Sequence, residues 1–148
     1  PFSVAQHALL VDQIVGLRAT SLSPRDRLAV LLHDAPEYVI GDMISPFKKV
    51  LGGNYKTVEA RLEAAIHIRF GLPSKLPATV KKAIKRADRI SAWMEATQIA
   101  GFTMAEADRF FGKPEAAVME GLSLTLRPPV ETRAAYLARH AALIAEMG

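Results

Sequence analysis

The stretch Ser23–Asp34, with the sequence SPRDRLAVLLHD, carries the strongest structural signal in the chain. Ser23 has the side-chain oxygen of a good N-cap, and Pro24 suits the first helical position, where no backbone N–H is needed. The run Leu28–Leu32 is apolar on every side, which is typical of a helix at the centre of a bundle. Pro36 should end or kink this helix, because its ring clashes with the preceding turn. The stretch therefore predicts a buried central helix.

The rest of the chain repeats the helical period between short breaks rich in Gly and Pro, and no stretch alternates like a strand. Ser3 and Gln6 have the spacing of a capping box, as do Thr103 and Glu106. These patterns predict an all-α, single-domain helical bundle over residues 1–148. The other expected helices are one after Ser3, a short one between Pro46 and Gly52, Tyr55–Phe70, Pro77–Ala100, one after Thr103, Pro114–Leu124 and Pro129–Met147.

The composition is that of a globular domain, since half of the 148 residues are hydrophobic and 23% are charged. Cysteine is absent, which excludes disulfides and thiolate metal ligands and favours a cytoplasmic location. No apolar stretch approaches the roughly 20 residues that cross a bilayer, so no membrane partner is expected. The chain begins at Pro1 rather than at Met, and we expect that an upstream segment is missing.

The net charge of +4 favours anionic partners through the long-range field of the protein. Lys82, Arg86 and Arg89 point away from the edge of their helix that carries Asp88, which predicts a solvated basic face. No element shows a pattern of base contacts, so we do not expect nucleic acid as the partner.

Four residues of the types that bind metals lie at informative positions: His7, His33, Asp34 and Asp88. His7 lies in the apolar stripe of the first helix, and His33 and Asp34 follow the apolar run of the second. An unpaired buried carboxylate is costly, so an acid at such a place needs a cation or several donors. Two imidazoles and two carboxylates suit Mn, Fe, Co, Ni or Zn better than Ca. Each residue alone also fits a structural role, since a single buried histidine is usually hydrogen bonded in a core.

The motifs around these residues decide between the two interpretations. The segments are Ser3–His7 (SVAQH), His33–Asp42 (HDAPEYVIGD) and Ala87–Ala92 (ADRISA). In this order they resemble the motifs S-V-A-x-H, H-D-A-x-E-x-x-x-G-D and A-D-x-x-S-A of the HD-domain metal-dependent phosphohydrolase superfamily. The likeness is closest to its bacterial 5′-deoxynucleotidase-like branch, and it covers about Ser3 to Gln98.

The resemblance implies a site built on one divalent metal ion, which could be Mn, Co, Fe, Ni, Zn or Mg. Glu37, which in a continued helix would share the metal-facing side with His33, would orient or deprotonate the water on the metal. Asp42 would deliver a proton to the leaving oxygen. The expected activity is hydrolysis of a nucleoside 5′-monophosphate or a similar small phosphomonoester, and a homodimer is the expected assembly. The implied metal ligands are His7, His33, Asp34 and Asp88.

Two alternative functions stay open at this point. A pyrophosphohydrolase acting on a signalling nucleotide usually carries a paired Glu-Asp shortly after His-Asp, whereas Ala35–Tyr38 contains one acid. A nucleotide-binding regulatory module without hydrolysis would be favoured by the loss of a metal ligand, and none of the four is lost.

The group that would bind the phosphate is not assigned by the sequence. Phosphoryl transfer depends on charge stabilisation, so a cationic side chain should reach the phosphate. Arg18 shares the helical face of His7 but lies about 16 Å further along the axis. That distance is too great for a shared phosphate. The sequence offers three other weak candidates, which fit a solvated basic face better: Lys48, Lys49 and Lys85.

Overall fold

The computed structural model describes residues 2–18, 21–41, 43, 50 and 53–148. Within these ranges the chain forms helices and no β-strand, which confirms the predicted all-α fold. None of the described helices has both the length and the apolar character needed to cross a bilayer. The helices are α1 (Val4–Arg18), α2 (Pro24–Leu31), α3 (Glu37–Ile40), α5 (Gly53–Arg69), α6 (Ala78–Gln98), α7 (Met104–Phe111), α8 (Ala116–Met119) and α9 (Pro129–Glu146).

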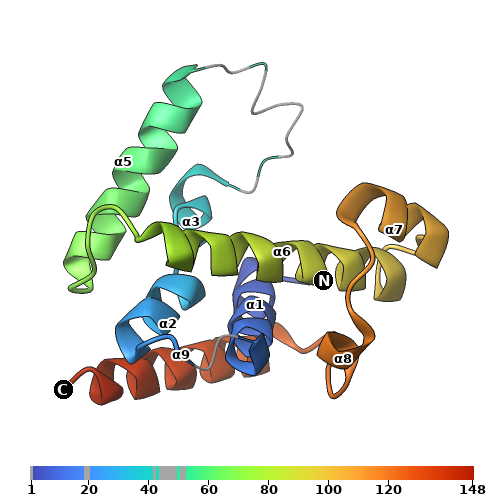
Figure 1. Cartoon of the computed structure of the whole chain (residues 1–148). Helices are drawn as coiled ribbons and strands as arrows, with labels where there is room; N and C mark the ends of the chain where they lie inside the picture. The colour runs from blue at the N-terminus through green and yellow to red at the C-terminus, as the bar shows by residue number, and fades with distance from the viewer. Residues whose placement is uncertain (1, 19–20, 42, 44–49, 51–52) are drawn as a thin grey trace.

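Helix α1 is the centre of the packing, because it contacts α2, α6, α8 and α9. In Figure 1, α6 runs across the middle of the molecule and α9 along its lower edge, with α1 and α2 between them. The buried apolar residues form two clusters, and α1 contributes to both. Ile14 belongs to the cluster against α6 and α8, whereas Ala8 belongs to the cluster with α2 and α9. The position of α1 therefore sets where the surrounding helices present their side chains.

Helix α2 is bounded as its sequence predicts. The Ser23 side chain accepts from the backbone N–H of Asp26, and Asp26 bonds back to the N–H of Ser23, which completes a capping box. The helix ends at Leu31, residues 32–36 form a turn, and Glu37 begins the separate helix α3. The predicted break at or before Pro36 is thus confirmed, and Glu37 does not continue α2.

Ser3 caps α1 by accepting from the N–H of Gln6 at 3.2 Å. The Gln6 side chain, however, does not complete the box, because its amide donates to the Thr125 carbonyl at 2.7 Å instead.

The helix expected over Pro114–Leu124 is reduced to α8, which stops where Gly121 adopts a φ of 79°. The helix expected between Pro46 and Gly52 falls mostly outside the described residues.

One buried carboxylate joins three helices. Asp12 of α1 is 5% exposed and accepts from Arg27 Nε of α2 at 2.7 Å and from Arg139 Nε of α9 at 2.8 Å. Arg27 Nη2 also donates to the Asp12 carbonyl at 2.8 Å. Gly16 provides the space for this guanidinium, because a Cβ at that position would lie 2.9 Å from Arg27 Nη1 and Nη2. Asp12 therefore fixes α1 against α2 and α9.

Replacement of Asp12 by alanine should destabilise the bundle, because it leaves two guanidinium groups without their carboxylate. We expect the free energy of unfolding to fall by about 3 kcal/mol, the low end of the range for breaking a buried ion pair, because the Arg27 and Arg139 side chains are 19% and 29% exposed. Urea denaturation followed by circular dichroism measures this. The matched control is Glu146→Gln, whose exposed carboxylate lies 3.9 Å from Arg139 Nη1, and equal effects of the two variants would contradict the role of Asp12.

Candidate metal centre

His7 is oriented by a carboxylate of α6 that is separate from the predicted ligands. Its Nδ1 lies 2.7 Å from Glu95 Oε1, and Ser91 Oγ donates to the same oxygen at 2.7 Å. Because a carboxylate only accepts, Nδ1 carries the proton of this bond. The other ring nitrogen of His7, Nε2, is thereby directed toward Asp34 and Asp88.

His33 is oriented in the same way by the backbone. Its Nδ1 donates to the Val30 carbonyl at 2.8 Å, and since a carbonyl only accepts, Nδ1 carries the proton. Nε2 is then the ring nitrogen that can bind a cation. That atom is buried and forms no hydrogen bond with the described part of the chain, although Asp34 Oδ2 lies 3.1 Å away. A second-sphere carbonyl on one nitrogen and an unused lone pair on the other are typical of a metal-binding histidine.

Three of the four predicted ligands, His7, His33 and Asp88, form one group, and Asp34 lies beside its two histidines. His7 Nε2 lies 3.3 Å from Asp34 Oδ2 and 3.3 Å from Asp88 Oδ1. Ligand atoms of His7, His33 and Asp88 all lie within 4.8 Å of one another. Donors that surround one divalent cation at about 2.1 Å stand roughly 3 to 3.5 Å apart, which matches the separations involving Asp34. The cluster, built from α1, the turn after α2 and α6, could therefore hold a metal ion.

The charges around His7 explain why a cation fits there. Burial lowers the pKa of His7, but the hydrogen bonds of Asp88 and Glu95 and the charges of Glu95 and Asp34 outweigh burial and raise it to about 10. Without a metal, His7 is thus protonated at neutral pH and supplies the positive charge between the carboxylates. A proton on His7 leaves the lone pair of His33 Nε2 unused, whereas a divalent cation would engage all four residues.

Two cavities open beside the centre, and Asp34 and Glu37 line both. One has a volume of about 590 Å³ and is mainly apolar, with walls that include Leu32 and Phe70. The other has a volume of about 240 Å³ and is mainly polar. Glu37 is therefore next to the centre as predicted, although a turn separates it from α2. The polar cavity is lined by His33, Asp34, Pro36, Glu37, Lys56, Glu59, Ala60 and Glu63.

The sequence prediction missed Glu95 and Lys56. Glu95 follows Asp88 by seven residues, so the two share a face of α6, and this spacing was the available signal. Lys56 shares a face of α5 with Glu59 and Glu63 in the same way. However, no local sequence signal predicts that α5 lies over the turn after α2.

Two of the cations considered for the phosphate, Arg18 and Lys85, line neither of the cavities beside the centre. Arg18 pairs with Glu115 through Nη2 and Oε2 at 3.0 Å. The predicted proton donor Asp42 and the candidates Lys48 and Lys49 lie outside the described residues. Lys56 is the one cationic side chain among the described residues that line the polar cavity.

The fold and the cluster define an all-α protein with a candidate metal centre, and comparison with known proteins adds its family. The uncharacterized protein RCAP_rcc00048 of Rhodobacter capsulatus is 55% identical over 143 residues, which are 97% of this chain and 73% of that protein. The chain belongs to the family of this protein. The uncharacterized protein YfdR of Escherichia coli is 36% identical over 83 residues, which are 55% of this chain and 42% of YfdR. No family model matches the chain.

Replacement of Glu95 by glutamine should weaken metal binding without removing a ligand. The amide can still accept from His7 Nδ1 but lacks the charge that makes the ring a stronger donor to the metal, and loss of such a partner typically costs about 10- to 100-fold in affinity. Titration of the metal-free protein with Mn²⁺ in a calorimeter measures this. Glu120→Gln removes an exposed carboxylate of the same size, and an equal affinity of the two variants would argue against the orienting role of Glu95.

Proposed function

We propose that the chain is an HD-type metal-dependent phosphohydrolase that releases phosphate from a nucleoside 5′-monophosphate or a similar small phosphomonoester. The observation that carries the proposal is the group of ligand atoms from His7, His33 and Asp88 within 4.8 Å of one another, with Asp34 beside both histidines. The same four residues are the ligands implied by the three HD-type sequence motifs. The geometry thus supports three of these ligands as one group and places Asp34 beside them.

The charge of the polar cavity explains why activity would require a metal. Its described lining contains four carboxylates, those of Asp34, Glu37, Glu59 and Glu63, and one ammonium group, that of Lys56. A phosphate dianion would be repelled from such a cavity in a metal-free protein. A divalent cation held by the cluster would neutralise charge on the phosphoryl group. It would also lower the pKa of water, so that water could lose a proton and attack phosphorus at neutral pH.

The chain's own residues would then position the groups and move the protons. Glu37 lies in the wall shared by both cavities, where its carboxylate is the candidate acceptor for the proton of the attacking water. Attack on phosphorus breaks the P–O bond to the alcohol, whose oxygen must gain a proton. Asp42 stays the predicted donor for this step. Lys56 supplies the positive charge that a phosphoryl oxygen needs on the α5 side.

The apolar cavity supports a substrate with an organic group. Its volume of about 590 Å³ falls within the range of small-ligand pockets, and it begins at Asp34 and Glu37. Its wall contains few polar groups, and the hydroxyl of Tyr136 already donates to the Leu31 carbonyl at 3.2 Å. A nucleoside or a similar ring system would be held there mainly by apolar contacts.

The direct test is phosphate release by the metal-stripped protein. Nucleoside 5′-monophosphates are supplied as a panel, and Mg²⁺, Mn²⁺, Co²⁺, Ni²⁺ or Zn²⁺ is added back separately. We expect one or more metals to restore release. His33→Ala should abolish it, because the lone pair that completes the ligand set is lost, and Glu37→Gln should lower kcat at least about 100-fold, because the proton acceptor is lost.

Three results would count against the phosphomonoesterase. Full activity of Glu37→Gln would remove this residue from the mechanism. Release of pyrophosphate from guanosine tetraphosphate, with no phosphate from the monophosphates, would favour the pyrophosphohydrolase. Metal and nucleotide binding without turnover would favour the regulatory module. Glu120→Gln serves as the exposed-carboxylate control and should keep the wild-type rate.

Replacement of Lys56 by glutamine should lower kcat/KM about tenfold, because one charge-assisted contact to the phosphate is lost while the metal ligands stay intact. Steady-state kinetics on the best monophosphate measure this. The exposed Lys75, in the turn before α6, provides the matched control Lys75→Gln. A loss of similar size in both variants would show a general effect of charge rather than a contact of Lys56.

A further inference from the structure

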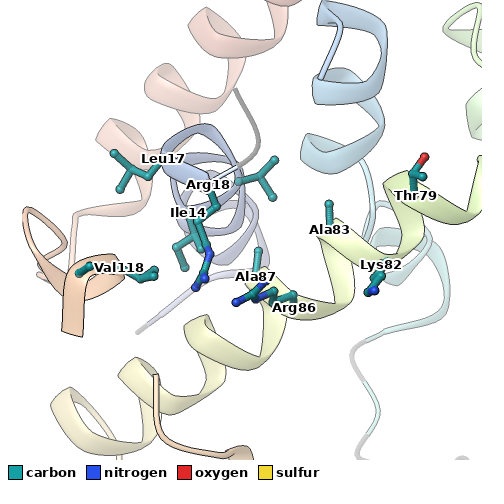
Figure 2. A pocket seen from close by; sticks show the side chains of 11 residues that line it. Ile14, Leu17, Arg18, Thr79, Lys82, Ala83, Arg86, Ala87 and Val118 are labelled. Atoms are coloured by element: carbon teal, nitrogen blue, oxygen red, sulfur yellow. The ribbon is translucent and has the colours of Figure 1, made fainter. Parts of the chain in front are cut away.

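A further cavity lies away from the metal centre, between α1, α6 and α8 (Figure 2). Its volume is about 500 Å³, and its apolar wall includes Ile14, Ala83 and Val118. Three cationic side chains border it: those of Arg18, Lys82 and Arg86. An apolar wall with cations on its border is complementary to a ligand that has an apolar part and an anionic part.

The positive charge of the chain is concentrated at this surface. A smaller cavity of about 190 Å³ shares Arg18 and Arg86 with the first and is also lined by Arg89, Lys113 and Glu115. The two cavities together are bordered by five cationic side chains and one carboxylate, which gives a net charge of 5 − 1 = +4. The whole chain has the same formal charge of +4, so the other ionised groups balance one another.

One carboxylate of the protein marks where an anion is held. Glu115 Oε1 lies 2.6 Å from Arg86 Nη2, and Glu115 Oε2 lies 3.0 Å from Arg18 Nη2. In Figure 2 the side chains of Arg18 and Arg86 approach each other from α1 and α6. The Glu115 side chain is 64% exposed, so little packing holds it between them. A phosphate has more charge and more acceptor oxygens than a carboxylate, and guanidinium groups bind it with two parallel bonds.

We propose that this surface binds a small organic phosphate. The phosphate group takes the place of Glu115 between Arg18 and Arg86, and the apolar ring of the ligand enters the larger cavity beside Ala83. This site is separate from the metal centre: Arg18 is about 16 Å from His7 along α1, and Arg86 lies on nearly the opposite side of α6 from Asp88.

The shape of the surface favours a small molecule over nucleic acid. The larger cavity has the volume of a small-ligand pocket, whereas single strands bind along open grooves lined by aromatic side chains. Among the residues that the structure describes, no aromatic side chain lines the larger cavity, and Phe111 is the one aromatic residue lining the smaller cavity.

The test uses 1-naphthylmethylphosphonate, whose C–P bond cannot be hydrolysed as an ester, titrated into the wild-type chain in EDTA by calorimetry. Inorganic phosphate and 1-naphthalenemethanol are its two matched fragments. We expect the joined probe to bind at least about tenfold more tightly than either fragment, because both parts of the site are then occupied at once. Equal affinities of the joined probe and one fragment would overturn the proposal.

Variants separate the two halves of the site. Arg18→Gln combined with Arg86→Gln should weaken the phosphonate at least about tenfold and leave 1-naphthalenemethanol unchanged. Ala83→Leu should weaken the naphthyl compounds and leave phosphate unchanged, because the larger side chain fills the cavity. Glu115→Gln should strengthen phosphonate binding, because the competing carboxylate loses its charge.

Arg133→Gln combined with Arg25→Gln removes the same two charges from exposed positions on α9 and α2 and is the control. An equal loss in this control would show that net charge alone attracts the probe, which would overturn the proposal. Binding of a single-stranded oligonucleotide that the Arg18 and Arg86 substitutions abolish, with no contribution from the naphthyl group, would assign the surface to nucleic acid instead. Binding of vesicles of anionic phospholipid that the same two substitutions abolish, again with no contribution from the naphthyl group, would assign the surface to a membrane. Circular dichroism of each variant establishes that the fold is retained.

Discussion

The ion pairs of Asp12 set the geometry on which the candidate centre depends. Two arginines, from α2 and α9, bind this one carboxylate of α1, so the three helices cannot shift along one another without separating buried charges. His7 lies five residues before Asp12 on α1, and His33 follows the end of α2. The contact that holds α1 to α2 therefore also places the two imidazoles opposite each other, with ring centroids 5.3 Å apart.

Within that frame, each histidine has one nitrogen engaged by an acceptor outside the cluster. The Val30 carbonyl engages His33, and the Glu95 carboxylate engages His7. Both Nε2 atoms are thus directed at the oxygens of Asp34 and Asp88, which carry like charges. A proton on His7 offsets part of this repulsion, but it does not engage Nε2 of His33. The proposed divalent cation would serve the two histidines and the two carboxylates together.

The sequence predicted the helices that have local signals, and its motifs pointed to residues that the fold brings close together. Two helix starts have signals in the local sequence. Ser23 bonds to Asp26 and is followed by Pro24 in the first helical position, and Thr103 bonds to Glu106. These signals can be recognised without knowing how the helices pack. Gln6 has the same local spacing, but it is used by the segment at Thr125 and Arg127, more than a hundred residues away. Contacts of that kind depend on how helices pack. Lys56 was missed because its position also depends on helix packing. Glu95 could have been placed near Asp88 from their seven-residue spacing, but the motifs give this glutamate no role.

The metal centre is the claim from which the proposed function follows, and diffraction tests it most directly. Crystals grown with Co²⁺ and measured at the cobalt absorption edge would show the ion by its anomalous scattering. We predict one strong peak about 2.0 to 2.2 Å from His7 Nε2, His33 Nε2 and oxygens of Asp34 and Asp88. A peak at another place, or no peak with His7 Nε2 still between the two carboxylates, would contradict the metal centre.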